Sequence, residues 1–192
     1  MPSNFTLHTV DSAPAASKPL LEASTKEWGF LPTLHANLGE SAPTLKAYQS
    51  LFALVLQTSF TPIEQQIAYV AVNVANECEY CTAGHTYLAR SVGMPETTIY
   101  ALREQEVIAE PRWQALRSFV EAVVRARGRV ADDDVDAFIA AGYIKAQVLE
   151  VVLIVATKVI SNYVNHIAHT PAEVFMADPS FGWVAPSRRQ AA

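Results

Sequence analysis

The sequence has few cysteines, no concentration of positive charge and no signal for export. Only 2 of its 192 residues are cysteine, and its 14 Lys and Arg are scattered among 19 Asp and Glu, with a net charge of -5 at pH 7. Proteins bind nucleic acids and anionic membranes through basic patches or stripes. We therefore expect neither of them as a main partner.

Segments that direct a chain to or across a membrane are also missing. The opening stretch MPSNFTLHTVDSAPAASK has neither the basic start nor the apolar run of a signal peptide. The longest apolar run, 148–160, is short for a bilayer and is interrupted by Glu150 and Lys158. We expect a soluble, cytoplasmic protein. In a reducing compartment, two neighbouring cysteines are more often catalytic or metal-binding than structural.

No stretch alternates apolar and polar residues as a β-strand does, and there is no repeat or low-complexity segment. Apolar residues recur instead at helical spacing. The predicted helices are 19–28, 32–38, one from 41, 61–76, 78–92, a short one after 95, 111–127, 132–141 and 145–168. The prediction is one all-α domain. Residues 1–40 form an N-terminal arm with short helices, 41–176 form the helical domain, and 177–192 form an irregular tail with mobile last residues.

The predicted helix 61–76 has informative polar residues at its start and along one face. Thr61 and Glu64 have capping-box spacing around Pro62, and Gln66 and Asn73 share a polar face of the helix that follows.

The last helix, 145–168, is apolar nearly all round, so we expect neighbours on every side, another subunit among them. Its polar residues Asn162, Asn165 and His166 need partners. They form a buried network or a helix end, or His166 lines a cysteine pocket or a subunit interface.

Both cysteines lie in the stretch NECEYCTAGH, three residues apart, with a histidine four residues later. On one helix, Cys78, Cys81 and His85 share a face. The free N–H groups of a helix start and a nearby histidine both favour a thiolate. Cys81 is closer to His85, so it is the expected nucleophile, and Cys78 would resolve the product.

Two other interpretations of this motif remain open. Zinc could bind Cys78, Cys81 and His85, with His166 or His169 as the fourth ligand. A single helical face is an unusual source of three such ligands, because zinc sites usually place a C-x-x-C pair on a turn. The third interpretation is that these are ordinary buried side chains.

The stretch CEYCTAGH resembles the C-x-x-C-x-x-x-H core of the alkylhydroperoxidase D-like proteins, within the carboxymuconolactone decarboxylase superfamily. The similarity extends upstream through TPIEQQIAYVAVNVANECEYC, and SNYVNHIAHTP resembles the late helix of the peroxidase-related members. In all it covers roughly residues 41–171. The resemblance implies an all-α, alkylhydroperoxidase D-like helical bundle that has no cofactor or metal and assembles as a homotrimer or homohexamer.

The resemblance also implies roles. The redox members reduce organic hydroperoxides with the cysteine pair. By position, Cys81 attacks the peroxide, Cys78 resolves it and His85 belongs to a proton relay. The family glutamate twelve residues before the first cysteine is Gln66 here, and glutamine holds a hydrogen bond but accepts no proton. Glu77 and Tyr80 are candidates to replace it in part.

The predicted function is therefore that of an antioxidant, peroxiredoxin-type thiol peroxidase, which takes an organic hydroperoxide and a dithiol reductant. Two alternatives stay open. One is a lyase like the decarboxylases that name the superfamily, whose chemistry does not require the cysteine pair. The other is a non-enzymatic, redox-sensing oligomer, which the replacement of glutamate by Gln66 keeps open.

Overall fold

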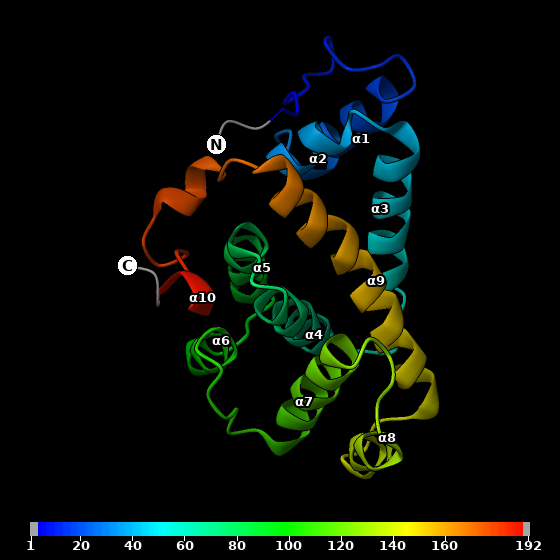
Figure 1. Cartoon of the computed structure of the whole chain (residues 1–192), viewed down its shortest axis with the longest axis vertical. Helices are drawn as coiled ribbons and strands as arrows, with labels where there is room; N and C mark the ends of the chain where they lie inside the picture. Colours follow the sequence, from blue (N-terminus) through cyan, green and yellow to red (C-terminus); the bar gives the residue numbers. More distant parts are fainter. Residues whose placement is uncertain (1–3, 190–192) are drawn as a thin grey trace.

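The computed structural model describes residues 4–189, and the regular structure within that range is helical (Figure 1). The elements are α1 (Lys18–Trp28), α2 (Thr33–Leu38), α3 (Ala42–Val55), α4 (Pro62–Ala75), α5 (Glu79–Ser91), α6 (Glu96–Arg103), α7 (Pro111–Arg125), α8 (Asp132–Ala140), α9 (Lys145–Ala168), the 3-10 helix η1 (Val174–Ala177) and α10 (Pro186–Arg189). The predicted all-α fold is confirmed, and most predicted helices begin and end within two residues of the observed ones.

Helix α4 is at the centre of the fold and packs against α5, α6, α7 and α9. Its capping box is formed, because Thr61 Oγ1 accepts from the Glu64 backbone N–H and the Glu64 carboxylate accepts from the Thr61 backbone N–H. Every residue from Glu64 to Val74 is buried. The polar face of Gln66 and Asn73 is therefore enclosed too, and it supplies polar side chains to the interior beside α5.

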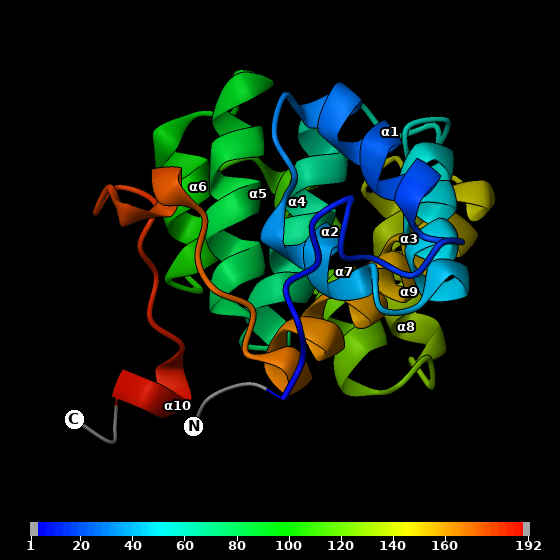
Figure 2. The ribbon, with the colours of Figure 1, turned by 90° about the horizontal axis from the view of Figure 1, so that it is seen from above.

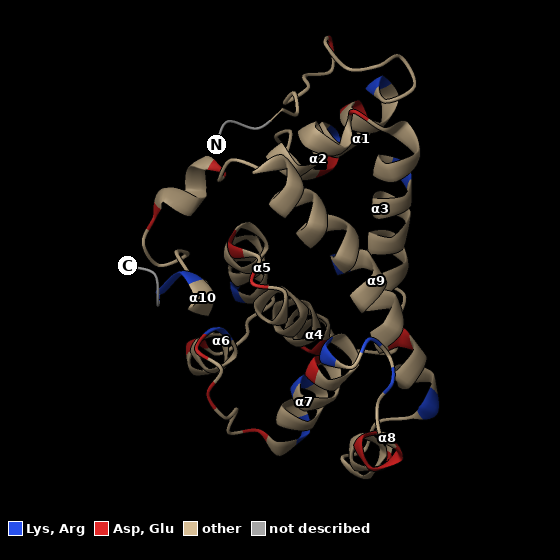
Figure 3. Cartoon of the chain, viewed as in Figure 1, with Lys and Arg blue, Asp and Glu red and all other residues tan. Residues whose placement is uncertain are grey.

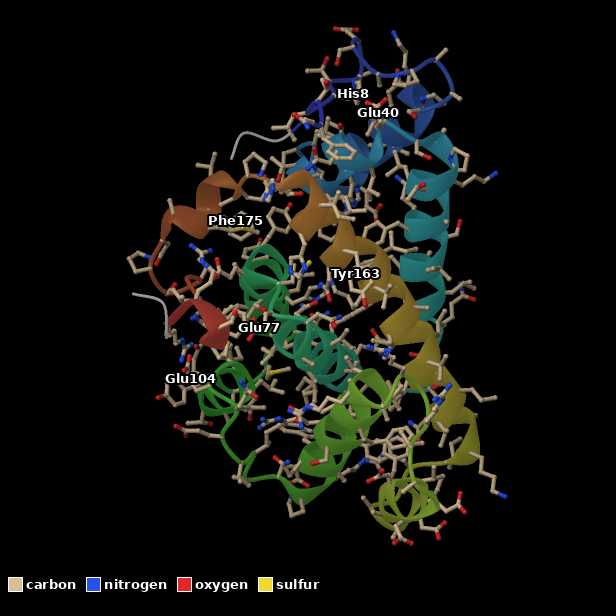
Figure 4. The ribbon with its side chains drawn as sticks, viewed as in Figure 1. His8, Glu40, Glu77, Glu104, Tyr163 and Phe175 are labelled. Atoms are coloured by element: carbon tan, nitrogen blue, oxygen red, sulfur yellow. The ribbon has the colours of Figure 1, made fainter. Side chains whose placement is uncertain are left out.

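Helix α9 crosses the molecule beside α3 and also packs against α2, α4 and α7 (Figure 1). The sequence led us to expect neighbours on every side of α9, another subunit among them. Within one chain, one side of α9 is left uncovered. Apolar side chains on its outer face are between half and three-quarters exposed: Leu149, Val152, Tyr163 and Ile167. Tyr163 projects from the front of α9 in Figure 4.

The full 24 residues of α9 are long and apolar enough to cross a membrane by length and composition, unlike the shorter run considered from the sequence. Core helices of soluble proteins pass the same test, and 39% of the residues in its most apolar window are buried inside the chain. Figure 3 shows Lys and Arg dispersed over several elements rather than gathered in a stripe.

The described part of the N-terminal segment, residues 4–40, belongs to the packed fold. Helices α1 and α2 contact each other and α3, and α2 contacts α9. Ahead of α1, the His8 imidazole contacts the Glu40 carboxylate at 2.7 Å (Figure 4), and the His8 backbone N–H donates to the Ala36 carbonyl. The predicted N-terminal arm thus closes one end of the helical domain.

The segment after α9 returns along the α5–α6 side of the molecule before α10 (Figure 2). The predicted irregular tail, 177–192, contains the short helix α10, and the described part of it is anchored. Trp183 is buried, Arg188 pairs with Glu79 at 2.6 Å, and Arg189 pairs with Glu104 at 2.7 Å. The mobility predicted for the last residues falls on 190–192, which lie outside the described residues.

Candidate active site

The two cysteines lie where the chain turns from α4 into α5. Glu77 adopts a left-handed conformation with φ of 54°, and Cys78 follows as the N-cap of α5 in extended geometry. The Cys78 backbone N–H donates to the Asn73 carbonyl at 2.9 Å. Cys81 occupies the first turn of α5, so the pair spans the cap and the first turn rather than a straight helical face. Both thiols are free and buried.

Side chains from α9 bind the two sulfur atoms. The Asn165 amide lies 3.0 Å from Cys81 Sγ and 3.8 Å from Cys78 Sγ, and Ser161 Oγ lies 3.8 Å from Cys81 Sγ. Asn165 was named from the sequence only as a polar residue needing a partner, and here it contacts both sulfurs.

The pKa values of the two cysteine thiols are shifted in opposite directions. Burial alone would raise the pKa of Cys81, but a hydrogen bond with the Cys78 side chain and the positive charge of Lys158 lower this pKa to about 5. That same hydrogen bond, together with burial, raises the pKa of Cys78 far above its usual range. With a pKa of about 5, Cys81 is roughly 99% thiolate at pH 7, while Cys78 keeps its proton. A nucleophilic Cys81 and a resolving Cys78 would require such a division, and the roles themselves stay a prediction.

Asn162 belongs to an amide network that fastens α9 to the turn between α4 and α5. Its amide donates to Asn73 Oδ1 at 3.0 Å, and its carbonyl oxygen accepts from Asn76 at 2.9 Å. The Asn73 amide in turn donates to the Cys81 carbonyl at 3.1 Å. Asn162 thus positions the cysteine segment, and the sequence alternative of a buried polar network describes its contacts.

His85 is buried between an amide and an ammonium group. Its Nδ1 lies 2.8 Å from Gln66 Oε1, its Nε2 lies 3.1 Å from Lys158 Nζ, and its ring packs on Tyr69 at 4.6 Å between centroids. Burial and the charge of Lys158 hold its pKa well below the usual range, so the imidazole is neutral. Because a lysine ammonium can only donate, Nε2 is the acceptor and Nδ1 carries the hydrogen that Gln66 Oε1 accepts.

Lys158 is a residue of the candidate site that sequence reasoning missed. It is only 1% exposed, and its ammonium lies over the Tyr69 ring at 5.6 Å as well as against His85. From the sequence it was noted only as an interruption of an apolar run. A usable signal was present, because positions 158, 161, 162 and 165 follow helical spacing and form one polar stripe on α9.

The remaining sequence candidates lie at different distances from the sulfurs. The Glu77 carboxylate accepts from the Ser187 backbone N–H at 3.3 Å and also contacts its hydroxyl, so it is engaged by the C-terminal segment. Tyr80 donates to Glu173 at 2.5 Å and lines the cavity beside Cys81. His166 is exposed on α9, away from the cysteines.

The structure does not group the ligands that the zinc interpretation requires. His169 ends α9 in a left-handed conformation and is exposed, as His166 is. Among residues 4–189, no three His, Cys, Asp or Glu side chains are grouped so as to hold a metal ion. His85 directs Nε2 at a lysine ammonium instead.

A cavity of about 260 Å³ lies against Cys81, Gly84 and His85. Its walls are mainly aromatic and apolar, and they come from distant parts of the chain: Trp28, Phe30, Leu34, Tyr48, Phe52, Tyr87, Phe175 and Met176. The Tyr87 and Phe175 rings pack at 5.2 Å, which brings the segment after α9 alongside α5 (Figure 4). The cavity therefore offers a medium-sized apolar molecule access to Cys81.

The polar groups of the cavity are few. Lys158 and His85 lie at the cysteine end, and Glu173 receives the Tyr80 hydroxyl. His35 also lines the cavity and contacts Ser24 Oγ at 2.8 Å, and burial lowers its pKa to about 4. His35 is thus neutral at pH 7, and Lys158 is the cation that the cavity presents.

The family model described as the carboxymuconolactone decarboxylase family matches residues 42–130. This stretch extends from α3 to the loop ahead of α8 and contains Cys78, Cys81 and His85. No curated protein matches the sequence significantly.

Several solved structures share the fold. A peroxidase-related protein with an alkylhydroperoxidase AhpD core, from Ralstonia eutropha JMP134, is 18% identical with a TM-score of 0.79, over 94% of this chain and 95% of that one. A peroxidase-related protein from Silicibacter sp. TM1040 is 16% identical with a TM-score of 0.75, over 91% and 93%. The debrominase Bmp8, as a cysteine-to-alanine variant in complex with 2,3,4-tribromopyrrole, is 16% identical with a TM-score of 0.74, over 91% and 94%. At these identities the likeness establishes the alkylhydroperoxidase D-like fold.

Proposed function

The chain belongs to the carboxymuconolactone decarboxylase family, and from that premise we propose that it is a thiol-dependent peroxidase that reduces organic hydroperoxides. One observation carries the proposal. Two free thiols lie buried together, and Cys81, which receives the Asn165 amide at 3.0 Å, adjoins an apolar cavity. The lowered pKa of Cys81 favours its thiolate. A thiolate is the reactive form of cysteine toward peroxides.

The proposed reaction needs only the two cysteines, the peroxide and a dithiol. Cys81 Sγ attacks the outer oxygen of the hydroperoxide, the O–O bond breaks, and the alkoxide takes up one proton to leave as an alcohol. Cys81 is now a sulfenic acid, and the Cys78 sulfur attacks it. A disulfide forms, and the hydroxyl leaves as water with the Cys78 proton. An external dithiol then returns both cysteines to thiols.

In this scheme His85 is placed in the proton relay of the leaving alkoxide because its Nε2 accepts from the Lys158 ammonium, which is the member of the pair that has a proton to give. Gln66 fixes the ring through Nδ1 and takes up no proton itself. Tyr80 holds the cavity wall through Glu173. The apolar walls favour an organic hydroperoxide over hydrogen peroxide, because an alkyl or aryl group is removed from water on binding.

The test follows the free thiols of the reduced protein during reaction with cumene hydroperoxide between pH 5 and pH 9. We expect both thiols to disappear together and the rate to be nearly constant above pH 6, because Cys81 is already ionised there. Cys81→Ser should abolish the reaction. Cys78→Ser should still consume one peroxide but form no intramolecular disulfide. Thiols that react no faster than free cysteine would sink the proposal.

Repeated turnover separates this proposal from the other functions. With a dithiol such as dithiothreitol, an enzyme consumes many equivalents of peroxide, whereas a redox sensor is oxidised once and stops. A lyase of the decarboxylase type would retain its activity in the double variant Cys78→Ser/Cys81→Ser, because that chemistry does not require the thiols.

A second candidate is reductive dehalogenation by the same cysteine pair. The aromatic cavity wall, with Tyr48, Phe52 and Tyr87, suits a flat halogenated ring, and the debrominase Bmp8 shares the fold. Cys81 would take bromine from a brominated pyrrole as a proton replaces it on carbon, and Cys78 would then displace bromide to give the disulfide. Bromide release from 2,3,4-tribromopyrrole by the reduced protein, measured by ion chromatography, would favour this candidate if cumene hydroperoxide is not reduced.

The proposal includes assembly of several copies, as a trimer or hexamer, through the outer apolar face of α9. Leu149 and Ile167 are 71% and 65% exposed there, and burying such side chains favours association. Light scattering at micromolar concentration should give a mass above that of one chain. The free thiols suit a reducing compartment, and we propose that the protein acts in the cytoplasm.

A further inference from the structure

A buried ammonium group without a carboxylate is the least expected feature of the site. Lys158 is 1% exposed, and the ion pairs found among residues 4–189 do not include it. Moving an ammonium from water into a protein interior is costly unless an opposite charge lies near it. The fold therefore places in the interior a cation that forms no ion pair with a carboxylate of the described chain. Glu173 lines the same cavity, but Tyr80 and Thr33 donate to it.

The direct contacts of this ammonium are with neutral groups. It donates to His85 Nε2 at 3.1 Å and lies over the Tyr69 ring at 5.6 Å. Both contacts orient the charge, but neither balances it. The anion available at this end of the cavity is the Cys81 sulfur, which adjoins the same cavity and interacts electrostatically with Lys158.

The register of α9 supports this pairing. Lys158, Ser161 and Asn165 lie on one side of the helix, three and four residues apart. Ser161 and Asn165 both contact Cys81 Sγ. The lysine thus belongs to the same stripe that binds the nucleophile, one turn nearer the start of the helix.

Gln66 makes this arrangement compatible with His85. An amide oxygen at Nδ1 leaves the imidazole neutral, so Nε2 offers a lone pair to the lysine. A carboxylate at position 66 would favour the imidazolium, whose Nε2–H would point at the ammonium. Gln66 and Lys158 are therefore compatible with each other, because they bind the two nitrogens of one neutral imidazole ring.

We infer that Lys158 is a positioning residue that holds Cys81 as the reactive thiolate, and that Gln66 keeps His85 neutral so that the imidazole can orient the lysine ammonium. The inference deepens the proposed function and takes its catalytic meaning from it. The departure from the family pattern at Gln66 is then a rebuilt site rather than a lost one.

Among the groups around this sulfur whose pKa is shifted, His35 changes charge near pH 4, at the lower end of the test, and Cys81 is the one expected to titrate above it. The titratable side chains that face it or share its cavity are Cys78, Tyr80 and His85 from α5, Tyr48 from α3, Tyr69 from α4, His35 from α2, Glu173 and Lys158. Burial raises the pKa of all three tyrosines, and it lowers the pKa of both histidines.

The test is the rate of alkylation of Cys81 by iodoacetamide between pH 4 and pH 9, in a Cys78→Ser background and in the wild type. Lys158→Met removes the charge and keeps a stem of similar length. We expect the alkylation rate at pH 6 to fall about tenfold, with the profile displaced to higher pH. Lys158→Arg keeps the charge and should retain most of the rate. Lys145→Met, at the exposed start of α9, is the matched control and should leave the profile unchanged.

Two results would overturn the inference. One is a Lys158→Met profile equal to that of the wild type, and the other is an equal loss in Lys158→Met and Lys158→Arg, which would indicate packing rather than charge. Lys158→Gln, neutral but polar, is measured in parallel and replaces Lys158→Met if that variant lacks the helical circular dichroism of the wild type. Iodoacetamide does not depend on peroxide reduction. A Lys158-dependent profile in a protein that fails to reduce cumene hydroperoxide would therefore refute the proposed function and leave this inference standing.

Discussion

The two long sides of α9 differ in a way that reverses the usual arrangement of a helix in a water-soluble fold. The buried side contains Lys158, Ser161, Asn162 and Asn165, whereas the outer side presents Leu149, Val152, Tyr163 and Ile167. On a helix with 3.6 residues per turn, these two sets lie on opposite sides. Val151 and Ile154, earlier on the buried side, join the hydrophobic core in the ordinary way. From Lys158 onward the buried side is mainly polar and the outer side apolar, and core packing of one chain explains neither the polar stripe nor the apolar outer face.

From this difference we propose that each side has a role outside ordinary core packing. Buried polar groups cost free energy unless they are hydrogen-bonded, and the inner stripe meets that cost through the cysteine sulfurs, His85 and Asn73. Exposed apolar groups form a patch that another surface can cover. We therefore expect substitutions on the inner side to change thiol chemistry and those on the outer side to change assembly.

The largest effect on thiol chemistry among the hydrogen-bonding residues of the inner side is expected at Asn165. Its amide lies 3.0 Å from Cys81 Sγ, and a hydrogen bond to a charged acceptor contributes about 1.5–3 kcal/mol. Asn165→Leu removes this donor, so the protonated form of Cys81 becomes more populated. We expect the iodoacetamide reaction at pH 5 to slow by about tenfold.

The control for Asn165→Leu is Tyr163→Leu, two residues earlier on the outer side, where the side chain is 52% exposed. That variant should leave the thiol reaction unchanged. If Asn165→Leu and Tyr163→Leu behave alike, the contrast between the two sides does not hold for the thiolate.

Much of the fold and of the cysteine segment was accessible from the sequence, and the reason is local chemistry. The capping box of Thr61 and Glu64, and the order Cys78, Cys81, His85 along α5, follow from spacing within a few turns of helix. The all-α fold follows from helical periodicity over most of the chain. These features need no knowledge of which helices become neighbours.

The rest depends on contacts between distant parts of the chain. Lys158 meets His85 across 73 positions, and Asn165 meets Cys81 across 84. Helical spacing reveals a polar stripe at these positions but not its partner. The cavity is similar, because its wall combines Trp28 of α1 with Phe175 of η1, which lie far apart in the sequence. The left-handed turn at Glu77, which places Cys78 at the cap rather than within the helix, also has no marker such as glycine.

A substitution on the outer side of α9 is expected to change the oligomeric state and to leave the reactivity of the thiols unchanged. Leu149→Lys places a charge at a position that is 71% exposed in one chain and that we propose is covered by another copy. A charge in such an interface is unfavourable when desolvated, so light scattering should show a shift toward lower mass. The alkylation rate at pH 6 should stay within about twofold of wild type, because Leu149 lies on the opposite side from the sulfur. An unchanged mass would place the contact between copies elsewhere.

The smallest effect is expected at His166, directly after Asn165 in the sequence. From the sequence, His166 was a candidate to line the cysteine pocket or a subunit interface, whereas the structure leaves it exposed and away from the sulfurs. An exposed side chain without such contacts changes stability by less than about 0.5 kcal/mol when it is replaced. His166→Ala should therefore leave the alkylation profile and the unfolding midpoint as they are in the wild type. A slower thiol reaction in this variant would show that the inner stripe extends further around α9 than its hydrogen bonds indicate. A changed mass by light scattering would instead assign His166 to the contact between copies, and would widen the outer face toward the end of the helix.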